Sequence, residues 1–363
     1  MVRLHMDRRQ AAPSLDAQPV MRSITYAMAQ LLLLLAELAE LGHPIRRAFR
    51  QLGKEQVMTA AWPTISYDRW APTCDTLHAH TQVLGKLAAR LAPPEPELQH
   101  AALRLTARGW ETAPLPAPDG SGLLVVMLDL HTHHAVVEHS GGPVERVPLT
   151  PNRAVAEVTS DVLAAVAAVG GAVQINPVPQ EVPWTVPLDQ DYEHASYDPD
   201  RVSDYFAAAT QAALILATFR APFRGRSTPV NAWWGTFDLA VALFSGLPAD
   251  APSSDFIMRN AADAQEIEIG WWPGDARHAG AAFFAFAHPT PPTFAHGRLS
   301  PAAARWDDTL GEYLLDWDDV RAASDPRAAA LEFARSAFRH ACLICGWDTA
   351  LAATADSKPP PLR

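Results

Sequence analysis

A proline-rich segment near the middle of the chain restricts its fold more than any other feature. Residues 176–187 read NPVPQEVPWTVP. Each proline removes a backbone hydrogen-bond donor and fixes φ, so this segment forms neither a helix nor a central strand. Its composition favours an extended connector that lies over the surface. The connector divides a chain of 363 residues, which is longer than the length at which a single hydrophobic core stops growing.

The order of predicted elements is the same on both sides of this connector. Before it, we expect a helix, a series of strands and a second helix over residues 74–85, 101–108, 122–130, 135–139, 144–149 and 151–169. After it, the same order is predicted over residues 201–220, 230–244, 266–272, 281–288, 312–317 and 326–345. The tripeptide Ser-Tyr-Asp precedes both series, at residues 66–68 and 196–198.

These patterns predict an α+β fold of two similar halves of antiparallel sheet with flanking helices, and they suggest an internal duplication. The predicted boundaries are residues 57–180 for the first half and residues 181–350 for the second. The alternative is one irregular α+β domain whose elements resemble each other by chance. If there are two halves, we expect a ligand pocket at their junction, because concave sites collect between structural units.

The two ends of the chain are predicted to lie outside these halves. Residues 1–56 are expected to form a tail and an extra N-terminal helix over residues 24–41, a stretch rich in strong helix formers. Its apolar run is interrupted by Gln30, Glu37 and Glu40. A membrane span needs about 20 apolar residues in succession, so we expect no membrane association and instead a helix that docks or forms a homodimer. Residues 351–363 are predicted to be a flexible C-terminal tail.

Composition and missing motifs narrow the functional classes. The formal net charge of -11 repels phosphate backbones and disfavours nucleic-acid binding. The chain has three cysteines, too few for a disulfide framework, which favours the cytoplasm. It lacks the glycine-rich and histidine motifs that bind nicotinamide, flavin, ATP or catalytic zinc. We therefore expect no cofactor and a small-molecule ligand.

Three side chains are candidates for acid–base catalysis: His194, Tyr197 and Asp238. An imidazole titrates near neutrality, and a phenol or carboxyl group can transfer a proton or donate a hydrogen bond. Asp198 also lies beside this cluster, but Asp198-Pro199 directly precedes a predicted helix and favours a helix cap. Structural roles for His194 and Tyr197 are the alternative.

A second group of residues is predicted to bind the substrate: His78, Gln82, Arg220, Trp234 and Trp272. His78 and Gln82 are four residues apart and share one helix face with Lys86. The two tryptophans belong to Trp-Trp pairs on predicted strands, where one indole of each pair faces inward and can form a flat apolar wall. A solvent-facing stripe and ordinary core packing are the alternatives.

We expect no metal site. The tract from His131 to His134 places at most two imidazoles on one side of a strand, and zinc requires three or four ligands. Cys342 and Cys345 have the spacing of a redox or zinc motif, but no second cysteine pair is present. The pattern favours two buried thiols.

Several longer motifs run through the chain: Trp62-Pro63-x-Ile65-Ser66-Tyr67, Thr76-Leu77-His78, His194-Ala195-Ser196-Tyr197-Asp198-Pro199, Trp234-Gly235-Thr236-Phe237-Asp238 and Trp272-Pro273-Gly274. Together they resemble an uncharacterised bacterial family, domain-of-unknown-function family 5996. The resemblance covers residues 60–348 and implies no activity, because the family has none assigned.

The chain departs from the pattern of that family where the resemblance implies polar residues. A His is expected in place of Asn231, a His-Glu pair in place of Ala264-Gln265, and arginines in place of Leu243 and Leu247. These departures imply a less polar ligand or a loss of catalysis. We therefore expect a cofactor-independent small-molecule enzyme of bacterial secondary metabolism (a cyclase, isomerase or lyase) or, alternatively, a non-catalytic protein that binds a small molecule or a partner.

Overall fold

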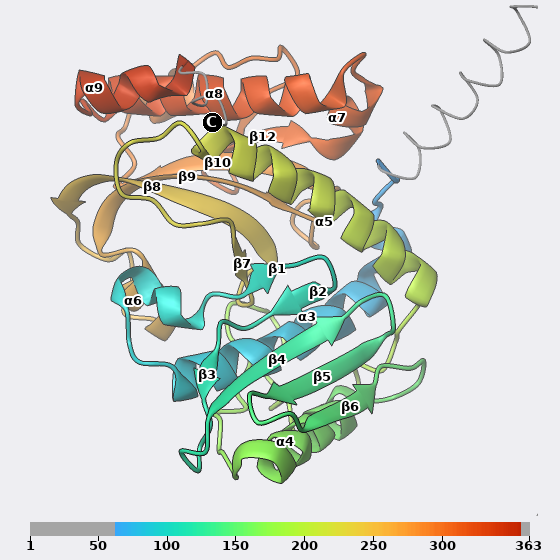
Figure 1. Ribbon diagram of the computed structural model, residues 1–363. Helices are drawn as coiled ribbons and strands as arrows, with labels where there is room; N and C mark the ends of the chain where they lie inside the picture. Colours follow the sequence, from blue (N-terminus) through green and yellow to red (C-terminus); the bar gives the residue numbers. More distant parts are fainter. Residues whose placement is uncertain (1–61, 357–363) are drawn as a thin grey trace, which may run out of the picture. The chain divides into compact units, whose positions relative to one another are not determined.

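The computed structural model describes residues 62–356, which belong to one compact unit. The predicted N-terminal helix over residues 24–41 lies outside the described residues. Within the compact unit, the two predicted halves each contribute an antiparallel sheet with flanking helices, and their side chains share one hydrophobic core (Figure 1). The α+β fold class is thereby confirmed.

The first half contains a helix, a meander of short strands and a second helix. Its elements are α3 (Tyr67–Leu91), η1 (Pro96–Ala101), β1 (Arg104–Leu105), β2 (Gly109–Glu111), β3 (Leu115–Pro116), β4 (Leu123–Asp129), β5 (His134–His139), β6 (Val144–Pro148) and α4 (Val155–Gly170). The six-stranded sheet has the order β1-β2-β4-β5-β6, and β3 pairs with β4. All of its strand pairs are antiparallel.

The second half repeats this order with longer strands. Its elements are α5 (Pro199–Arg220), β7 (Asn231–Trp233), β8 (Asp238–Pro248), α6 (Phe256–Ala261), β9 (Ala264–Trp272), β10 (Ala282–His288), η2 (Phe294–His296), β11 (Arg305–Asp307), β12 (Glu312–Asp316), α7 (Trp317–Ala322), α8 (Pro326–Ile344), α9 (Thr349–Ala352) and η3 (Ala353–Asp356). The sheet is again antiparallel and six-stranded, with the order β7-β8-β9-β10-β12-β11. Residues 351–356 form helical turns, so the predicted C-terminal tail begins too early.

Sequence signals explain where the helices of the second half begin. Asp198 accepts hydrogen bonds from the backbone amides of Asp200 and Arg201, and Pro199 occupies the first turn of α5. The predicted cap is therefore confirmed, because the carboxylate satisfies amides that have no partner within the helix. In the described part of the chain, α5 alone has the length and hydropathy of a membrane span, and half of that window is buried inside the protein.

The predicted strand over residues 230–244 is wrong, because a turn divides it into β7 and β8. Phe237 has a φ of 61°, in the left-handed region that ends an extended strand. Its ring is buried and stacks on Trp110 of the first half and on Tyr205 of α5, with centroid distances of 5.2 and 5.1 Å. The shared core thus holds Phe237 in the turn that precedes Asp238.

The two sheets are joined at their first strands. The backbones of Leu103, just before β1, and Ala232 of β7 exchange two hydrogen bonds of 3.1 and 2.9 Å. Beside them, Arg104 donates to the side-chain oxygen of Asn231, whose amide group donates to Gln99 at 3.1 Å. Asn231, where the sequence resemblance implied a histidine, therefore helps to join the two halves.

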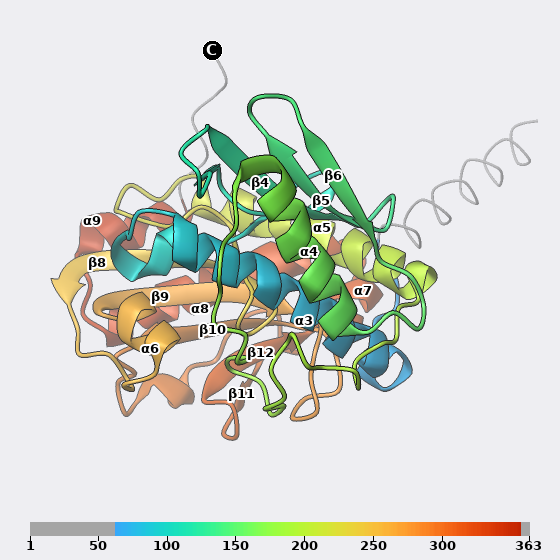
Figure 2. The same cartoon turned by 90° about the horizontal axis from the view of Figure 1, so that it is seen from below.

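The two faces of the second sheet have different environments. Because side chains alternate along a strand, residues such as Leu239, Ile267 and Phe283 point to one face and enter the shared core. Helices α5 and α8 contact this face. Figure 2 shows the two sides of the sheet: α6 lies in front of the strands and α8 lies behind them. Among residues 62–356 no layer of helices covers the opposite face, on the side of α6, and that face carries the candidate site.

Candidate functional site

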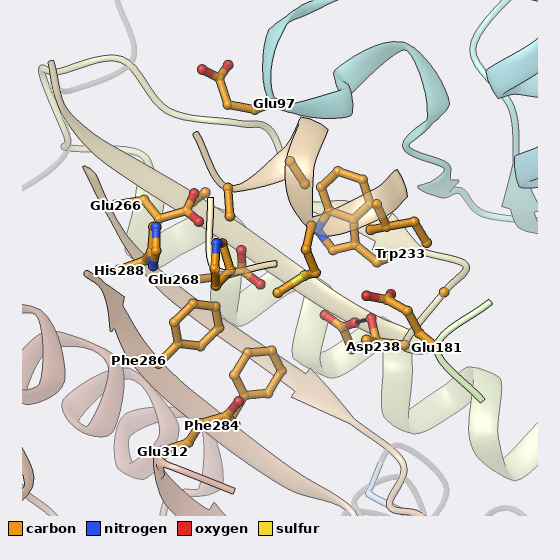
Figure 3. Close-up of a pocket in the computed structure, with 18 of the residues that line it drawn as sticks. Glu97, Glu181, Trp233, Asp238, Glu266, Glu268, Phe284, Phe286, His288 and Glu312 are labelled. Carbon is orange, nitrogen blue, oxygen red and sulfur yellow. Dashed lines mark hydrogen bonds between the residues drawn. The ribbon is translucent and has the colours of Figure 1, made fainter. Parts of the chain in front are cut away.

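A cavity of about 510 Å³ lies on this second face of the second sheet (Figure 3). Strands β8, β9, β10 and β12 form its floor, and α6, η1 and the turn between β7 and β8 form its walls. Its volume is in the range of small-molecule sites.

Aromatic rings cover much of the cavity floor. Phe284 and Phe286 are two residues apart on β10 and therefore face the same side, with their rings nearly parallel and their centroids 6.3 Å apart. Gly270 makes room for Phe284, since a Cβ atom at that glycine would lie 2.2 Å from the phenyl ring. Trp272 meets Phe284 edge-on at 6.1 Å. These rings form an apolar surface, which aliphatic side chains such as Ile257 and Met258 extend.

Six carboxyl groups line the same cavity: Glu97, Glu181, Asp238, Glu266, Glu268 and Glu312. Desolvation raises the pKa of Asp238 and of Glu312 to about 7 and that of Glu266 to about 8. Burial and the neighbouring carboxyl groups raise the pKa of Glu268 well above its usual value. Glu97 differs from the others because it forms an ion pair with Arg226, with one contact of 2.7 Å.

Asp238 and Glu181 face each other at one end of the cavity (Figure 3). Asp238 is 5% exposed; one carboxyl oxygen accepts a hydrogen bond from Thr236, and Oδ2 has no partner among the described residues. Glu181 is exposed at the cavity mouth, and partial desolvation followed by repulsion from Asp238 raises its pKa to about 7. Glu181 has a φ of 58°, and such backbone strain in a non-glycine residue is typical of functional sites.

A polar stripe on α3 positions both members of this carboxyl pair. Gln82 exchanges two hydrogen bonds of 2.8 and 2.9 Å with the backbone of Gln180, directly before Glu181. Lys86 donates to the carbonyl of Val178 at 2.6 Å. The connector is thus anchored on α3, and it contributes Glu181 to the cavity.

His78 fixes the turn that precedes Asp238, the other member of the carboxyl pair. Its Nε2 lies 2.9 Å from the carbonyl oxygen of Trp234 and 3.0 Å from that of Gly235, so this nitrogen carries a proton and donates. Burial lowers the pKa of His78 to about 4, which keeps the ring neutral. His78 and Gln82 therefore lie behind the cavity wall as positioning residues, and neither lines the cavity.

Replacing Gln82 by leucine is expected to free the connector from α3. The side chain keeps its size but loses both hydrogen bonds to Gln180, which should cost about 1–3 kcal/mol of unfolding free energy. Hydrogen–deuterium exchange should then be faster at the amide of Gln180. Unchanged exchange in Gln82→Leu would show that Lys86 alone anchors the connector.

The structure does not bring the three predicted catalytic residues together. Asp238 lines the cavity, whereas His194 and Tyr197 do not. Nδ1 of His194 lies 2.7 Å from Asp191, and the buried hydroxyl of Tyr197 lies 3.0 Å from Nδ1 of His133. Each of these side chains is thus engaged by a partner outside the cavity.

The predicted substrate-binding residues are also divided. Trp234 and Trp272 line the cavity. Arg220 lies elsewhere, where its Nε donates to the hydroxyl of Ser227 at 3.0 Å. The cavity lies on one face of the second sheet, whereas the pocket was predicted at the junction of the halves. The connector and η1 are nevertheless parts of its wall.

Sequence reasoning missed five of the six cavity carboxyl groups, all except Asp238. Glu266 and Glu268 alternate with Ile267 and Ile269, and this period of two places both acids on the face opposite the core. That signal was present in the predicted strand. Glu181 has no such signal, because its position depends on the distant contact with Gln82.

Within residues 62–356, no three His, Cys, Asp or Glu side chains are arranged to hold a metal ion. His131 and His133 contact different groups, the carbonyl of Ala107 and the hydroxyl of Tyr197. Cys342 is buried, and desolvation raises its pKa to about 12, so it is a protonated thiol. Carboxyl and aromatic side chains are prominent in the lining of the cavity.

The fold and cavity define an α+β protein with two joined antiparallel sheets and an acidic, aromatic-floored site on one of them. The chain belongs to the family of unknown function DUF5996, whose family model matches residues 62–354. The resemblance seen in the sequence is thereby confirmed. No curated protein and no solved structure matches the chain significantly.

Most of the positions at which the sequence resemblance implied other, more polar residues lie at the end of the second sheet that carries Glu266. Ala264 packs with Ala242 and Phe244 in a small apolar cluster, and the side-chain oxygen of Gln265 accepts a hydrogen bond of 3.1 Å from Ser245. Leu243 is buried in the shared core. Ala264 and Leu243 thus take part in apolar packing, whereas Leu247 is exposed.

Proposed function

We propose that the protein is a cofactor-independent enzyme that performs acid–base chemistry on a small organic molecule. Isomerisation, elimination and cyclisation are the reaction types that need only positioned proton-transfer groups and a shaped pocket. The observation that carries the proposal is the facing pair of Asp238 and Glu181 in an aromatic-floored cavity. A cytoplasmic place in bacterial secondary metabolism is part of the same proposal.

The two carboxyl groups suit complementary roles. Repulsion between neighbouring carboxylates favours a state in which one group is ionised and the other protonated, and both titrate near neutrality. Asp238, with its unpartnered Oδ2, is the group assigned to take a proton from the substrate or return it. Glu181 at the exposed mouth can exchange protons with solvent. The pKa values near 7 are those that a proton-transferring group requires.

Deuterium uptake tests this assignment. A bacterial metabolite extract is incubated with the protein in D2O, and the compounds are analysed by mass spectrometry. An enzyme that moves protons through Asp238 should incorporate solvent deuterium into its substrate. Asp238→Asn should reduce this incorporation by about 10²–10⁴-fold, because the amide cannot act as a base. The control Glu145→Gln removes an exposed carboxyl group from β6 and should incorporate deuterium like the parent. Equal incorporation in Asp238→Asn would contradict the role of Asp238.

A second candidate function is ligand binding without catalysis. It is favoured by the number of carboxyl groups, because Glu266, Glu268 and Glu312 exceed what one proton transfer requires. A binding protein would return every bound compound without isotopic change, and this outcome separates the two functions.

A further inference from the structure

The cavity carries six carboxyl groups, whereas the cations among residues 62–356 that act on them are Arg226 and Arg277. Among the described residues, Glu181, Asp238, Glu266, Glu268 and Glu312 form no ion pair. The basic side chains that line the cavity are Arg277 and His288. Arg277 is bound by Asp275 through contacts of 2.7 and 3.0 Å, and Nε2 of His288 lies 2.9 Å from the carbonyl oxygen of Asp250.

Asp238 shows most directly that a partner is missing. Its side chain is 5% exposed, it lines the cavity, and Oδ2 has no hydrogen-bond partner among the described residues. Leaving a buried polar group unpaired costs free energy, and an unpaired buried charge costs more. A cationic ligand would remove this cost by supplying both a donor and the opposite charge.

The carboxyl groups are spread along the cavity. Asp238 is level with Trp272 in the β8–β9 register, and Glu268 stands four residues before Trp272 on β9. At about 3.3 Å per residue, these two levels are roughly 13 Å apart along the sheet. Figure 3 shows Glu181 and Asp238 at one end, Glu266 with His288 at the other, and Glu268 between them. One small cation cannot contact both ends.

Aromatic faces lie between the two acidic ends. Phe284 and Phe286 present nearly parallel rings, and Trp233 lines the opposite wall. Such rings pack against methylene groups and attract ammonium groups through their faces. No three metal ligands converge in the described part of the chain, so the arrangement fits an organic cation better than a metal ion.

We propose that the cavity binds an aliphatic cation with two or more amino groups, one held by Glu181 and Asp238 and another by Glu266 and Glu268. The methylene chain between these amino groups would lie along Phe284 and Phe286. This inference deepens the proposed function and rests on it, because it names the substrate class of the same cavity.

Isothermal titration calorimetry at pH 7.5 tests the substrate class with four probes: spermidine, butylamine, magnesium chloride and glucose. Spermidine is expected to bind at least tenfold more tightly than butylamine, and its affinity should fall as sodium chloride is raised, because charge drives the binding. Asp238→Asn and Glu268→Gln should each weaken spermidine binding tenfold or more. Glu145→Gln removes an exposed carboxyl group from the other sheet, and this variant should bind spermidine like the parent.

Thermal melts separate lost binding from lost folding. A buried carboxyl group without a partner destabilises the empty protein, so Asp238→Asn should melt at the same or a higher temperature than the parent. Loss of binding together with a lower melting temperature in both variants would instead make these residues structural. Tighter binding of magnesium or glucose than of spermidine would also overturn the inference.

The two proposals can fail independently. Spermidine binding that requires Asp238, without deuterium uptake by any amine, would support the substrate class and contradict the enzyme. Deuterium uptake into a neutral compound that requires Asp238, without amine binding, would support the enzyme and contradict the substrate class.

Discussion

Raising the pH from 6.5 to 8 should lower the unfolding free energy of the empty protein by on the order of 2–4 kcal/mol, where one pKa unit corresponds to about 1.4 kcal/mol. Desolvation raises the pKa of Asp238 and Glu312 to about 7 and that of Glu266 to about 8, and it raises the pKa of Glu268 well above its usual value. In this pH range the unfolded chain has already lost these protons, while the folded protein still holds part of them. Stability must therefore fall as the pH rises through the folded-state pKa values.

The pH range is chosen because other buried groups act in the opposite direction outside it. Burial lowers the pKa of His78 to about 4 and that of His80 to about 3, so both histidines reduce stability as the pH falls below about 6.5. Burial also lowers the pKa of Lys86 to about 8, and this group adds stability above that pH. Glu181 is exposed, so water screens its contribution.

Urea unfolding at pH 6.5 and pH 8, at constant ionic strength, measures this effect. Glu268→Gln should flatten the dependence on pH, since the amide does not ionise, whereas Glu145→Gln should leave it unchanged. A parent protein that is equally stable at both pH values would mean that the cavity carboxyl groups are solvated as in the unfolded chain.

Gly85→Ala is expected to destabilise the protein by more than about 3 kcal/mol, although alanine favours helix over glycine by up to about 1 kcal/mol. A Cβ atom at Gly85 would lie 2.1 Å from the ring of Trp234, which is 1% exposed and is also fixed by a hydrogen bond of 3.1 Å from its Nε1 to Ala101. Either α3 or the indole must move. Because Trp234 adjoins the turn that leads to Asp238, the cavity wall should move with it.

A double-mutant cycle checks that the loss comes from this contact. Trp234→Leu removes the ring that the new methyl group would strike, so the combined variant should be more stable than the sum of the two single changes predicts. Circular dichroism melts of the four proteins give the coupling energy. Additive losses would place the strain of Gly85→Ala somewhere other than at Trp234.

Much of the fold could be predicted because its signals are local. Asp198-Pro199 marks the beginning of α5 in the sequence itself, and the strands β9 and β10 follow from alternation and β-branched or aromatic residues. The break between β7 and β8 could not be predicted in this way. It depends on Phe237 packing between Trp110 and Tyr205, which come from distant parts of the chain.

The candidate site was less predictable for the same reason. Asp238, Trp234 and Trp272 were among the predicted site residues and line the cavity. His194 and Tyr197 were chosen for their chemistry and their closeness in sequence, but Asp191 and His133 engage them elsewhere. Side-chain type indicates which chemistry is available, whereas long-range packing decides which side chains meet.

The two backbone hydrogen bonds between Leu103 and Ala232, which join the sheets, suggest how such a chain could arise. They form an antiparallel bridge between the residue directly before β1, at the edge of one sheet, and β7, at the edge of the other. A two-fold axis between two identical subunits brings equivalent edges together in this same orientation. A polypeptide consisting of one half could thus assemble as a symmetric dimer through that edge, and gene fusion would then leave one sheet free to acquire the acidic cavity while the other kept its supporting role.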